Sequence, residues 1–316
     1  MSLFSLIAAL LLEQLHPLSS RPYLSRWLSH YAHFFQHHFN AGEHRLGKIA
    51  WLMAVLLPVS GMALLYWLLY RVSPLLAWAF NVLVLYLTMG FHHFSHHYTA
   101  IYQALRDDDL PQARALLADW RGQRCHELNA EEIVRLSIEE ALLASHRRVF
   151  GVIVWFIFGM VLSLGPAGAV LYRLAQFLAV RWNGRDAGTQ AFGTTQAFGN
   201  FARTVYRWIE WLPLRMTAST FAIVGNFEDT LYCWRTQAGH WPDPEAGIVL
   251  ASGAGALGVH LGWPIAQDGQ LQDRPALGMG EEADIEFMRS AVGLVWRALI
   301  LWIVVLLLLG LASLVG

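Results

Sequence analysis

The sequence predicts an all-α, polytopic integral membrane protein with cytoplasmic amphipathic helices and a glycine- and proline-rich loop before its last span. Three observations predict this class. Hydrophobic residues make up 56% of the 316 residues, and charged residues make up only 14%, against about 25% in soluble domains. Mean hydropathy is +0.40. Long apolar runs alternate with polar segments of helical pattern. We expect a single membrane domain over residues 1–316.

The first elements are apolar helices of different length. Residues 2–15 are shorter than the roughly 20 residues that a span needs. They also lack the basic region and cleavage site of a signal peptide, so we expect an uncleaved, partly embedded helix. Residues 49–70 predict a full span that Pro58 and Gly61 would kink. Residues 74–91 predict a second span, and the short connection between the two indicates an antiparallel hairpin.

The next segment, residues 92–148, is polar with a helical pattern. Gly122 and the ELNAEE stretch divide it, and Asn129 is expected to cap the helix that follows. Basic residues in this segment and in residues 16–48 outnumber the single Arg71 of the short connection. The positive-inside rule therefore predicts that both segments are cytoplasmic.

The second half of the chain contains two more apolar elements. Residues 149–178 are long for one span and short for two, with LGPAG in the middle, so they predict a re-entrant hairpin or one broken helix. Residues 212–225 are a short apolar stretch that fits an interfacial helix. Residues 291–316 predict the final span.

The stretch GALGVHLGWP, from Gly255 to Pro264, lies in polar surroundings before the final span. Gly253, Gly255, Gly258 and Gly262 fall within ten residues. Glycine serves where the backbone takes a positive φ or closely approaches another group. The stretch therefore predicts either a tight structural hairpin or a ligand-facing loop.

Acidic residues are the second kind of candidate. Asp107, Asp108 and Asp109 are consecutive. They predict either a solvated turn, with Asp109 capping the next helix, or a site for magnesium or a phosphate-bound metal. Glu139 and Glu140 precede the broken apolar segment, where charged side chains are either functional or anchors at the membrane interface.

Histidine, lysine and cysteine usage limits the remaining functions. His92 and His96 lie one helical turn apart, a spacing that could bind a metal in a metal-handling membrane protein or simply mark an interface. Lys48 is the only lysine and has no phosphate-loop context, which excludes a P-loop. The net charge of −1 argues against a nucleic-acid partner. Cys125 and Cys233 form neither a disulfide framework nor a zinc motif.

The C-terminal motifs resemble those of the CobD/CbiB family. GALGVHLGWP, the spaced Gly269, RPALG and the last apolar helix carry the resemblance, and ALRDDDLPQARALLADWRG is similar to the family's cytoplasmic segment. Members are polytopic cobalamin-biosynthesis proteins that join adenosylcobyric acid to aminopropanol or its phosphate through an amide, using ATP and Mg²⁺. The resemblance implies a multi-pass protein of the bacterial inner membrane. Its implied partners are the lipid bilayer, a corrinoid substrate and other membrane or pathway proteins.

The resemblance also implies site residues. Glu139 takes the first place of the family's Glu-x-x-x-Glu-Asn-x-x-Asp-Gly run, and the Asp triplet is the dense acid cluster that remains. The expected catalytic residues are Glu139, Asp107, Asp108 and Asp109. The expected cofactor-binding residues are Gly255, Gly258, Gly262 and Arg274.

Several positions depart from the family's pattern. Leu143, Ala144, Arg147 and Arg148 occupy the later places of that acidic run, which removes ligands for magnesium. Three segments, MSLFSLIAALLLEQL, RRVFGVIVWFIFG and WLPLRMTASTFAIVGNFE, resemble instead AmpE, a related inner-membrane protein associated with β-lactamase induction. The alternative function is therefore an AmpE-like, non-catalytic signalling protein.

Overall fold

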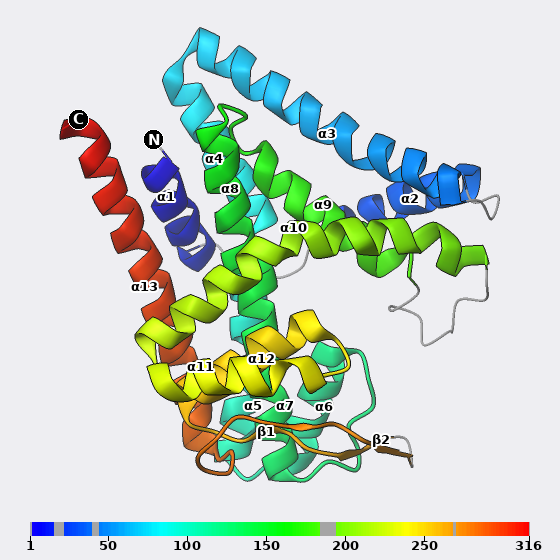
Figure 1. Ribbon diagram of the computed structural model, residues 1–316, viewed down its shortest axis with the longest axis vertical. Coiled ribbons are helices and arrows are strands. Elements are labelled where there is room, and N and C mark those ends of the chain that lie inside the picture. The colour runs from blue at the N-terminus through cyan, green and yellow to red at the C-terminus, as the bar shows by residue number, and fades with distance from the viewer. Residues whose placement is uncertain (1, 16–21, 40–43, 184–193, 268–269, 316) are drawn as a thin grey trace. The chain divides into compact units, whose positions relative to one another are not determined.

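The computed structural model describes residues 2–15, 22–39, 44–183, 194–267 and 270–315. Within these ranges nearly every element is a helix, and the strands are two or three residues long (Figure 1). The predicted all-α class is confirmed. The chain divides into two compact units, residues 1–90 with 151–213 and residues 91–150 with 214–316.

The first unit is entirely helical over its described residues. Its elements are α1 (Ser2–Leu15), α2 (Pro22–Phe39), α3 (His44–Val72), α4 (Pro74–Thr88), α8 (Gly151–Val161), α9 (Ala167–Arg181) and the first part of α10 (Thr194–Val224). Helices α8 and α9 pack together because glycines lie where they touch: a Cβ on Gly168 would come within 1.9 Å of the Trp155 carbonyl oxygen. The break expected at LGPAG therefore separates two helices.

Among the described residues, three helices are long and apolar enough to cross a membrane: Arg45–Val72, Ala130–Val161 and Ile285–Ala312. The first and third contain most of the spans predicted at 49–70 and 291–316. Helix α4 is apolar but has only 15 residues, so it is shorter than the expected 74–91. The single membrane domain over 1–316 stays a prediction.

The second of these helices corrects a predicted boundary. A helix was expected to end at residue 148, with a separate apolar element starting at 149. Instead α7 (Ala130–Ser145) continues through the π-helical turn η1 (His146–Phe150) directly into α8. The sequence changes from polar to apolar at residue 149, after Arg147 and Arg148, but the helix continues through this change.

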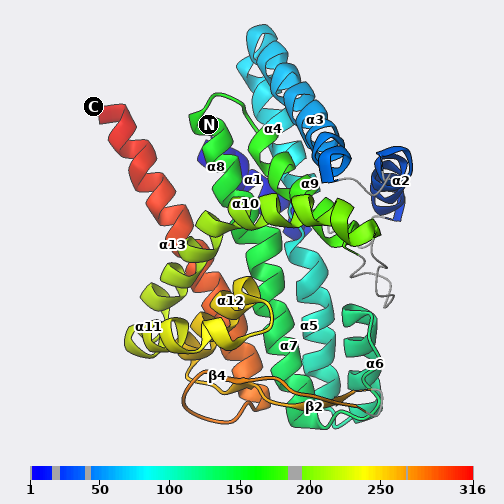
Figure 2. The same cartoon turned by 45° about the vertical axis from the view of Figure 1, so that its right-hand side comes forward.

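The second unit holds the remaining elements. They are α5 (Phe91–Arg106), α6 (Leu110–Arg121), α7, η1, the end of α10, α11 (Phe227–Thr236), η2 (Ala238–His240), α12 (Pro244–Leu257), β1 (Leu261–Gly262), β2 (Ile265–Gln267), β3 (Gln270–Gln272), β4 (Ala276–Leu277) and α13 (Ile285–Val315). Helices α5, α6 and α7 lie side by side (Figure 1 and Figure 2).

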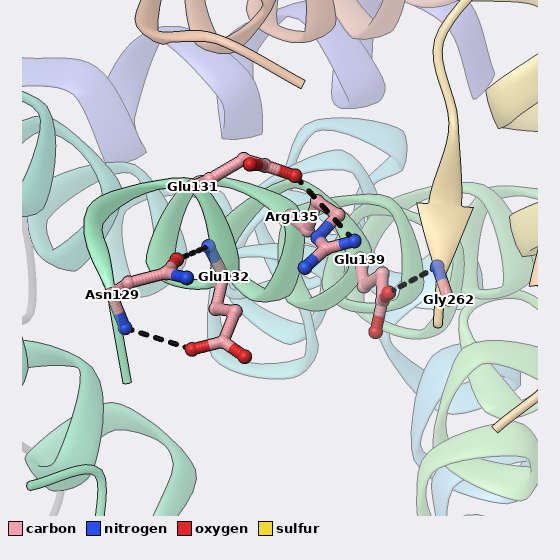
Figure 3. Close-up of polar contacts among 6 residues, drawn as sticks. All are labelled: Asn129, Glu131, Glu132, Arg135, Glu139 and Gly262. Atoms are coloured by element: carbon pink, nitrogen blue, oxygen red, sulfur yellow. Dashed lines mark hydrogen bonds and ion pairs between the residues drawn. The ribbon is translucent and has the colours of Figure 1, made fainter. Parts of the chain in front are cut away.

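Side-chain caps define the helix ends in this unit. Asp109 caps α6 by accepting the Gln112 N–H at 3.0 Å, and Gly122 ends that helix with φ 66°. Asn129 caps α7 by accepting the Glu132 N–H, while the Glu132 carboxylate accepts the Asn129 N–H, both at 2.8 Å (Figure 3). Such a reciprocal pair satisfies two otherwise unpaired donors. The predicted caps and the division at Gly122 are confirmed.

Helix α12 lies in the middle of the unit, with every residue from Val249 to Ala256 buried. Glycines permit its close contacts. A Cβ on Gly253 would lie 2.6 Å from the Leu142 side chain of α7, and one on Gly255 would lie 2.6 Å from the Asp229 carbonyl oxygen of α11. Helix α12 is therefore packed between α7 and α11.

The glycine-rich stretch after α12 forms antiparallel strand pairs, as the hairpin alternative predicts, and its contact with a ligand stays a prediction. β1 pairs antiparallel with β4, with Gly262 opposite Ala276, and β2 pairs antiparallel with β3. The N–H of Glu281 donates to the Gly258 carbonyl at 3.1 Å, which ties the end of this region to the end of α12. This arrangement holds β1 against α7. Gly269, which contributed to the family resemblance, lies outside the described residues.

Candidate functional site

Glu139 is a buried carboxylate in the second unit. It lies near the middle of α7, and only 8% of its side chain is exposed. Its Oε1 accepts the backbone N–H of Gly262 at 2.9 Å, as Figure 3 shows, and its Oε2 pairs with Nη2 of Arg274. A buried charge is tolerated when an opposite charge and hydrogen bonds accompany it. Both oxygens of Glu139 therefore have donors.

The pairing of β1 with β4 brings these donors to Glu139. Gly262 lies opposite Ala276, two residues after Arg274, and the N–H of Trp263 donates to the Pro275 carbonyl at 3.4 Å. Gly262 has φ 79°, and a Cβ there would lie 2.1 Å from the Pro275 oxygen. Only glycine fits this position, because any side chain would push the two strands apart.

Trp241 completes the group. The guanidinium carbon of Arg274 lies 5.0 Å from the Trp241 ring centroid, which is the geometry of a cation–π contact. The same ring would lie 3.3 Å from a Cβ on Gly262. Glu139, Gly262, Arg274 and Trp241 thus form one compact group, which we call the acid–arginine centre.

Two arginines, one in this centre and one a helical turn before Glu139 on α7, retain buried N–H groups without an acceptor among the described residues. One is Nη1 of Arg274, and the other is Nε of Arg135. Arg135 lies one helical turn before Glu139 on α7, and its Nη1 is 3.6 Å from a carboxylate oxygen of Glu131 (Figure 3). The centre therefore offers hydrogen-bond donors to a further acceptor.

Trp263 follows Gly262 and has an unusual backbone. Its φ is 67°, and its side chain is 45% exposed. The left-handed conformation costs a residue with a Cβ about 1–2 kcal/mol. Such outliers occur frequently at functional sites. The hydrogen bond of its N–H to Pro275 helps to maintain the conformation.

The Asp triplet lies apart from these contacts. Asp107, Asp108 and Asp109 are exposed in the turn between α5 and α6, where Asp108 has φ 56° and Asp109 caps α6. Over the described chain, the polar contacts of Glu139 go to Gly262 and Arg274 and none goes to the triplet. The structure does not bring the four expected catalytic residues into contact.

The glycines expected to bind a cofactor have different positions. Gly262 belongs to the acid–arginine centre with Arg274, as described above. Gly255 is buried in the contact of α12 with α11, and Gly258 ends α12 with φ 67°. The structure therefore gives Gly255 and Gly258 roles in packing and chain reversal, and their binding of a cofactor stays a prediction.

The expected metal residues are only partly described. Both His92 and His96 lie on α5, but the side chain of His92 falls outside the described residues, and His96 is exposed. Within the described ranges, no group of three or more His, Cys, Asp or Glu side chains could hold a metal ion. Mg²⁺ does not fit the acid–arginine centre by itself, because the single carboxylate of that centre, Glu139, is paired with the Arg274 guanidinium.

Sequence reasoning missed Trp241 and Arg135. Trp241 is distant from Arg274 along the chain, so no local pattern connects them. Arg135 gave a usable signal, because it lies one helical turn before Glu139 and therefore on the same face of the helix.

Comparison with known proteins identifies the family. The sequence profile described as "CobD/Cbib protein" matches residues 6–295. The "Cobalamin biosynthesis protein CobD" of Stutzerimonas stutzeri (strain A1501) is 36% identical over 314 residues, covering 97% of this chain and 98% of that protein. The protein of the same description from Chromobacterium violaceum is 36% identical over 250 residues, covering 79% of this chain and 76% of that protein.

More distant relatives carry the same description. The one from Leptospira interrogans is 25% identical over 203 residues, covering 63% of this chain and 61% of that protein. No solved structure matches the chain. The AmpE-like alternative gains no support from these comparisons. The extent of the profile match and the coverage of the first relative show that the chain belongs to the CobD/CbiB family of cobalamin-biosynthesis proteins.

Proposed function

We propose that this chain forms the amide bond between adenosylcobyric acid and aminopropanol or its phosphate, and that the acid–arginine centre is its reactive site. One observation carries the proposal: Glu139 and Arg274, 135 residues apart in sequence, meet as a buried ion pair. Burying two charges is costly unless they pair, so a buried ion pair that joins segments this far apart in sequence is a candidate functional site.

The two side chains suit the two needs of amide formation. When the amine nitrogen attacks the activated carboxyl carbon, negative charge develops on the carboxyl oxygen, and a guanidinium such as Arg274 stabilises it. The new C–N bond forms as the bond from carbon to the activating group breaks. The nitrogen must also lose a proton, and we assign Glu139 as its acceptor, since each carboxylate oxygen keeps a lone pair besides its one hydrogen bond.

ATP and Mg²⁺ are part of the proposal because the family resemblance implies them. ATP would supply the activating group for the carboxyl carbon. The described residues contain no group of three or more metal-ligating side chains, so we assign no step to a metal held by this chain. The guanidinium groups of Arg274 and Arg135 are the local positive charges available for phosphate oxygens.

We also propose a multi-pass location in the bacterial inner membrane, with a corrinoid and other pathway or membrane proteins as partners. Three helices long and apolar enough to span a bilayer support this location. The polar segment around α5 and α6 would lie in the cytoplasm, because basic residues concentrate there relative to the α3–α4 connection.

Complementation tests the proposal. A strain without its own synthase, supplied with cobyric acid, would receive the wild-type chain, Glu139→Gln or Glu140→Gln. Glu140 is the matched control, being the next residue on α7 and less buried than Glu139. We expect cobalamin-dependent growth with the wild type and with Glu140→Gln, and none with Glu139→Gln at equal membrane content. No growth with wild-type protein present in the membrane would refute the proposal.

A second variant tests the Asp triplet. Replacing Asp107, Asp108 and Asp109 together by Asn removes three charges, while Asn still caps a helix and tolerates positive φ. We expect this variant to keep growth. Growth with Glu139→Gln but not with the triple variant would move the reactive site to the triplet.

A further inference from the structure

We infer that the acid–arginine centre contains an oxyanion subsite, in which Nη1 of Arg274 and Nε of Arg135 donate to a carboxylate or phosphate group of the substrate. The inference rests on the proposed function and adds a ligand class to the same site. Both nitrogens are buried, and neither has an acceptor among the described residues.

Burial makes these unsatisfied donors informative. Only 10% of the Arg274 side chain and 12% of the Arg135 side chain are exposed. Buried N–H groups are normally paired, because leaving one without an acceptor costs free energy. A buried guanidinium that keeps a free N–H is therefore set up to receive an acceptor from a ligand.

The geometry directs the subsite to one side of α7. Arg135 and Glu139 lie one helical turn apart on the same face of this helix (Figure 3). The Glu139 carboxylate orients Arg274 through Nη2, and stacking on Trp241 further restricts the guanidinium plane. Glu139 thus occupies one edge of Arg274 and leaves Nη1 for another partner.

The chemistry of the donors selects the ligand. Guanidinium groups carry donors and no acceptors, so the complementary group bears acceptors only. Carboxylates and phosphates fulfil this condition and form the shortest, strongest hydrogen bonds with arginine. Arg274 and Arg135 are both cationic, so their charge favours an oxyanion over a cation as the ligand.

Ligand-induced stabilisation of the purified full-length chain in detergent tests the inference. The unfolding temperature would be measured in potassium phosphate, potassium acetate and potassium chloride at equal ionic strength. When the anion concentration is ten times its dissociation constant, binding stabilises the folded protein by RT ln 11. This raises the unfolding temperature by roughly 3–5 °C. A rise in phosphate alone identifies a phosphate subsite, and a rise in acetate identifies a carboxylate subsite.

Three variants make the test specific, each compared with its own chloride baseline. Arg135→Lys and Arg274→Lys keep the charge but lose the planar guanidinium, so we expect both to lose the rise. Arg114→Lys is the control, because Nε of Arg114 already donates to the Leu128 carbonyl at 2.7 Å, and it should keep the rise. No rise in the wild type, or a rise that all three variants keep or all three lose, would overturn the subsite.

This readout separates the two proposals. A specific rise together with failed complementation overturns amide formation and keeps the subsite. Complementation without any specific rise overturns the subsite and keeps amide formation.

Discussion

Gly262→Ala tests most directly whether the β1–β4 hairpin holds the acid–arginine centre together. Gly262 has φ 79°, and a Cβ would lie 2.1 Å from the Pro275 carbonyl oxygen. Gly258 is the matched control, because it has φ 67° and a Cβ added there would meet no atom within 4 Å. The two substitutions therefore share the backbone cost and differ in the steric clash.

The magnitudes follow from the structure. The left-handed conformation costs alanine about 1–2 kcal/mol, partly offset by about 0.4–1 kcal/mol from the restricted unfolded chain. Gly258→Ala should therefore destabilise by about 1 kcal/mol. In Gly262→Ala the strands must also separate, which breaks the hydrogen bond to the buried Glu139 carboxylate at a further cost of about 1–3 kcal/mol. We expect a total loss of roughly 3 kcal/mol.

Thermal unfolding followed by a thiol-reactive dye provides the assay. Cys125 and Cys233 are buried and form no disulfide, and both belong to the unit that contains Gly262. They should react only when this unit opens. We expect the unfolding temperature to fall by about 3 °C in Gly258→Ala and by about 10 °C in Gly262→Ala. Equal shifts in the two variants would refute the close contact of Gly262 with Pro275.

Three further predictions concern the same unit. Glu139→Gln should lower the free energy of unfolding in urea by about 3 kcal/mol, because it leaves the Arg274 charge unpaired. The double variant Glu139→Gln with Arg274→Met should recover most of this stability and still fail to support growth. Trp263→Gly should unfold about 3 °C above Trp263→Ala, because both lose the half-buried indole and only glycine avoids the cost of φ 67°; equal unfolding temperatures would contradict the backbone assignment. Burial and then the charge of Asp229 raise the pKa of the Cys233 thiol to about 11 from 9.0, so its contribution to stability should be complete below pH 9 and fall as the pH rises toward 11. Unfolding of wild type and of Cys233→Ala, followed by tryptophan fluorescence over pH 8–11, measures the difference in stability between them.

Local features of the fold were predictable from the sequence. Asn129 and Asp109 cap their helices through side chains that act within three residues, so neighbouring sequence alone defines these helix starts. Gly122 ends its helix for a similarly local reason, the low cost of a left-handed glycine. The continuity of α7 into α8 was missed, because the sequence changes from polar to apolar at residue 149. Such a change does not show whether a helix ends there.

The site was predictable only as separate residues. Glu139, Gly262 and Arg274 were each singled out through the family resemblance, but nothing in the sequence indicated that they touch. The Asp triplet was grouped with Glu139 because it is the densest acid cluster, and density along the chain says nothing about distance in the fold. Trp241 had no sequence signal for its contact with Arg274.

The sequence by itself determined the all-α membrane class, the family and the helix caps, because hydropathy, motif order and capping act over short stretches of chain. Only the tertiary structure decided that Glu139 meets Gly262 across 123 residues and Arg274 across 135. Those contacts depend on the packing of α12 against α7 and on the register of β1 with β4. Both are properties of elements that meet only after the chain has folded, since the energy that joins them comes from burial and pairing between distant segments.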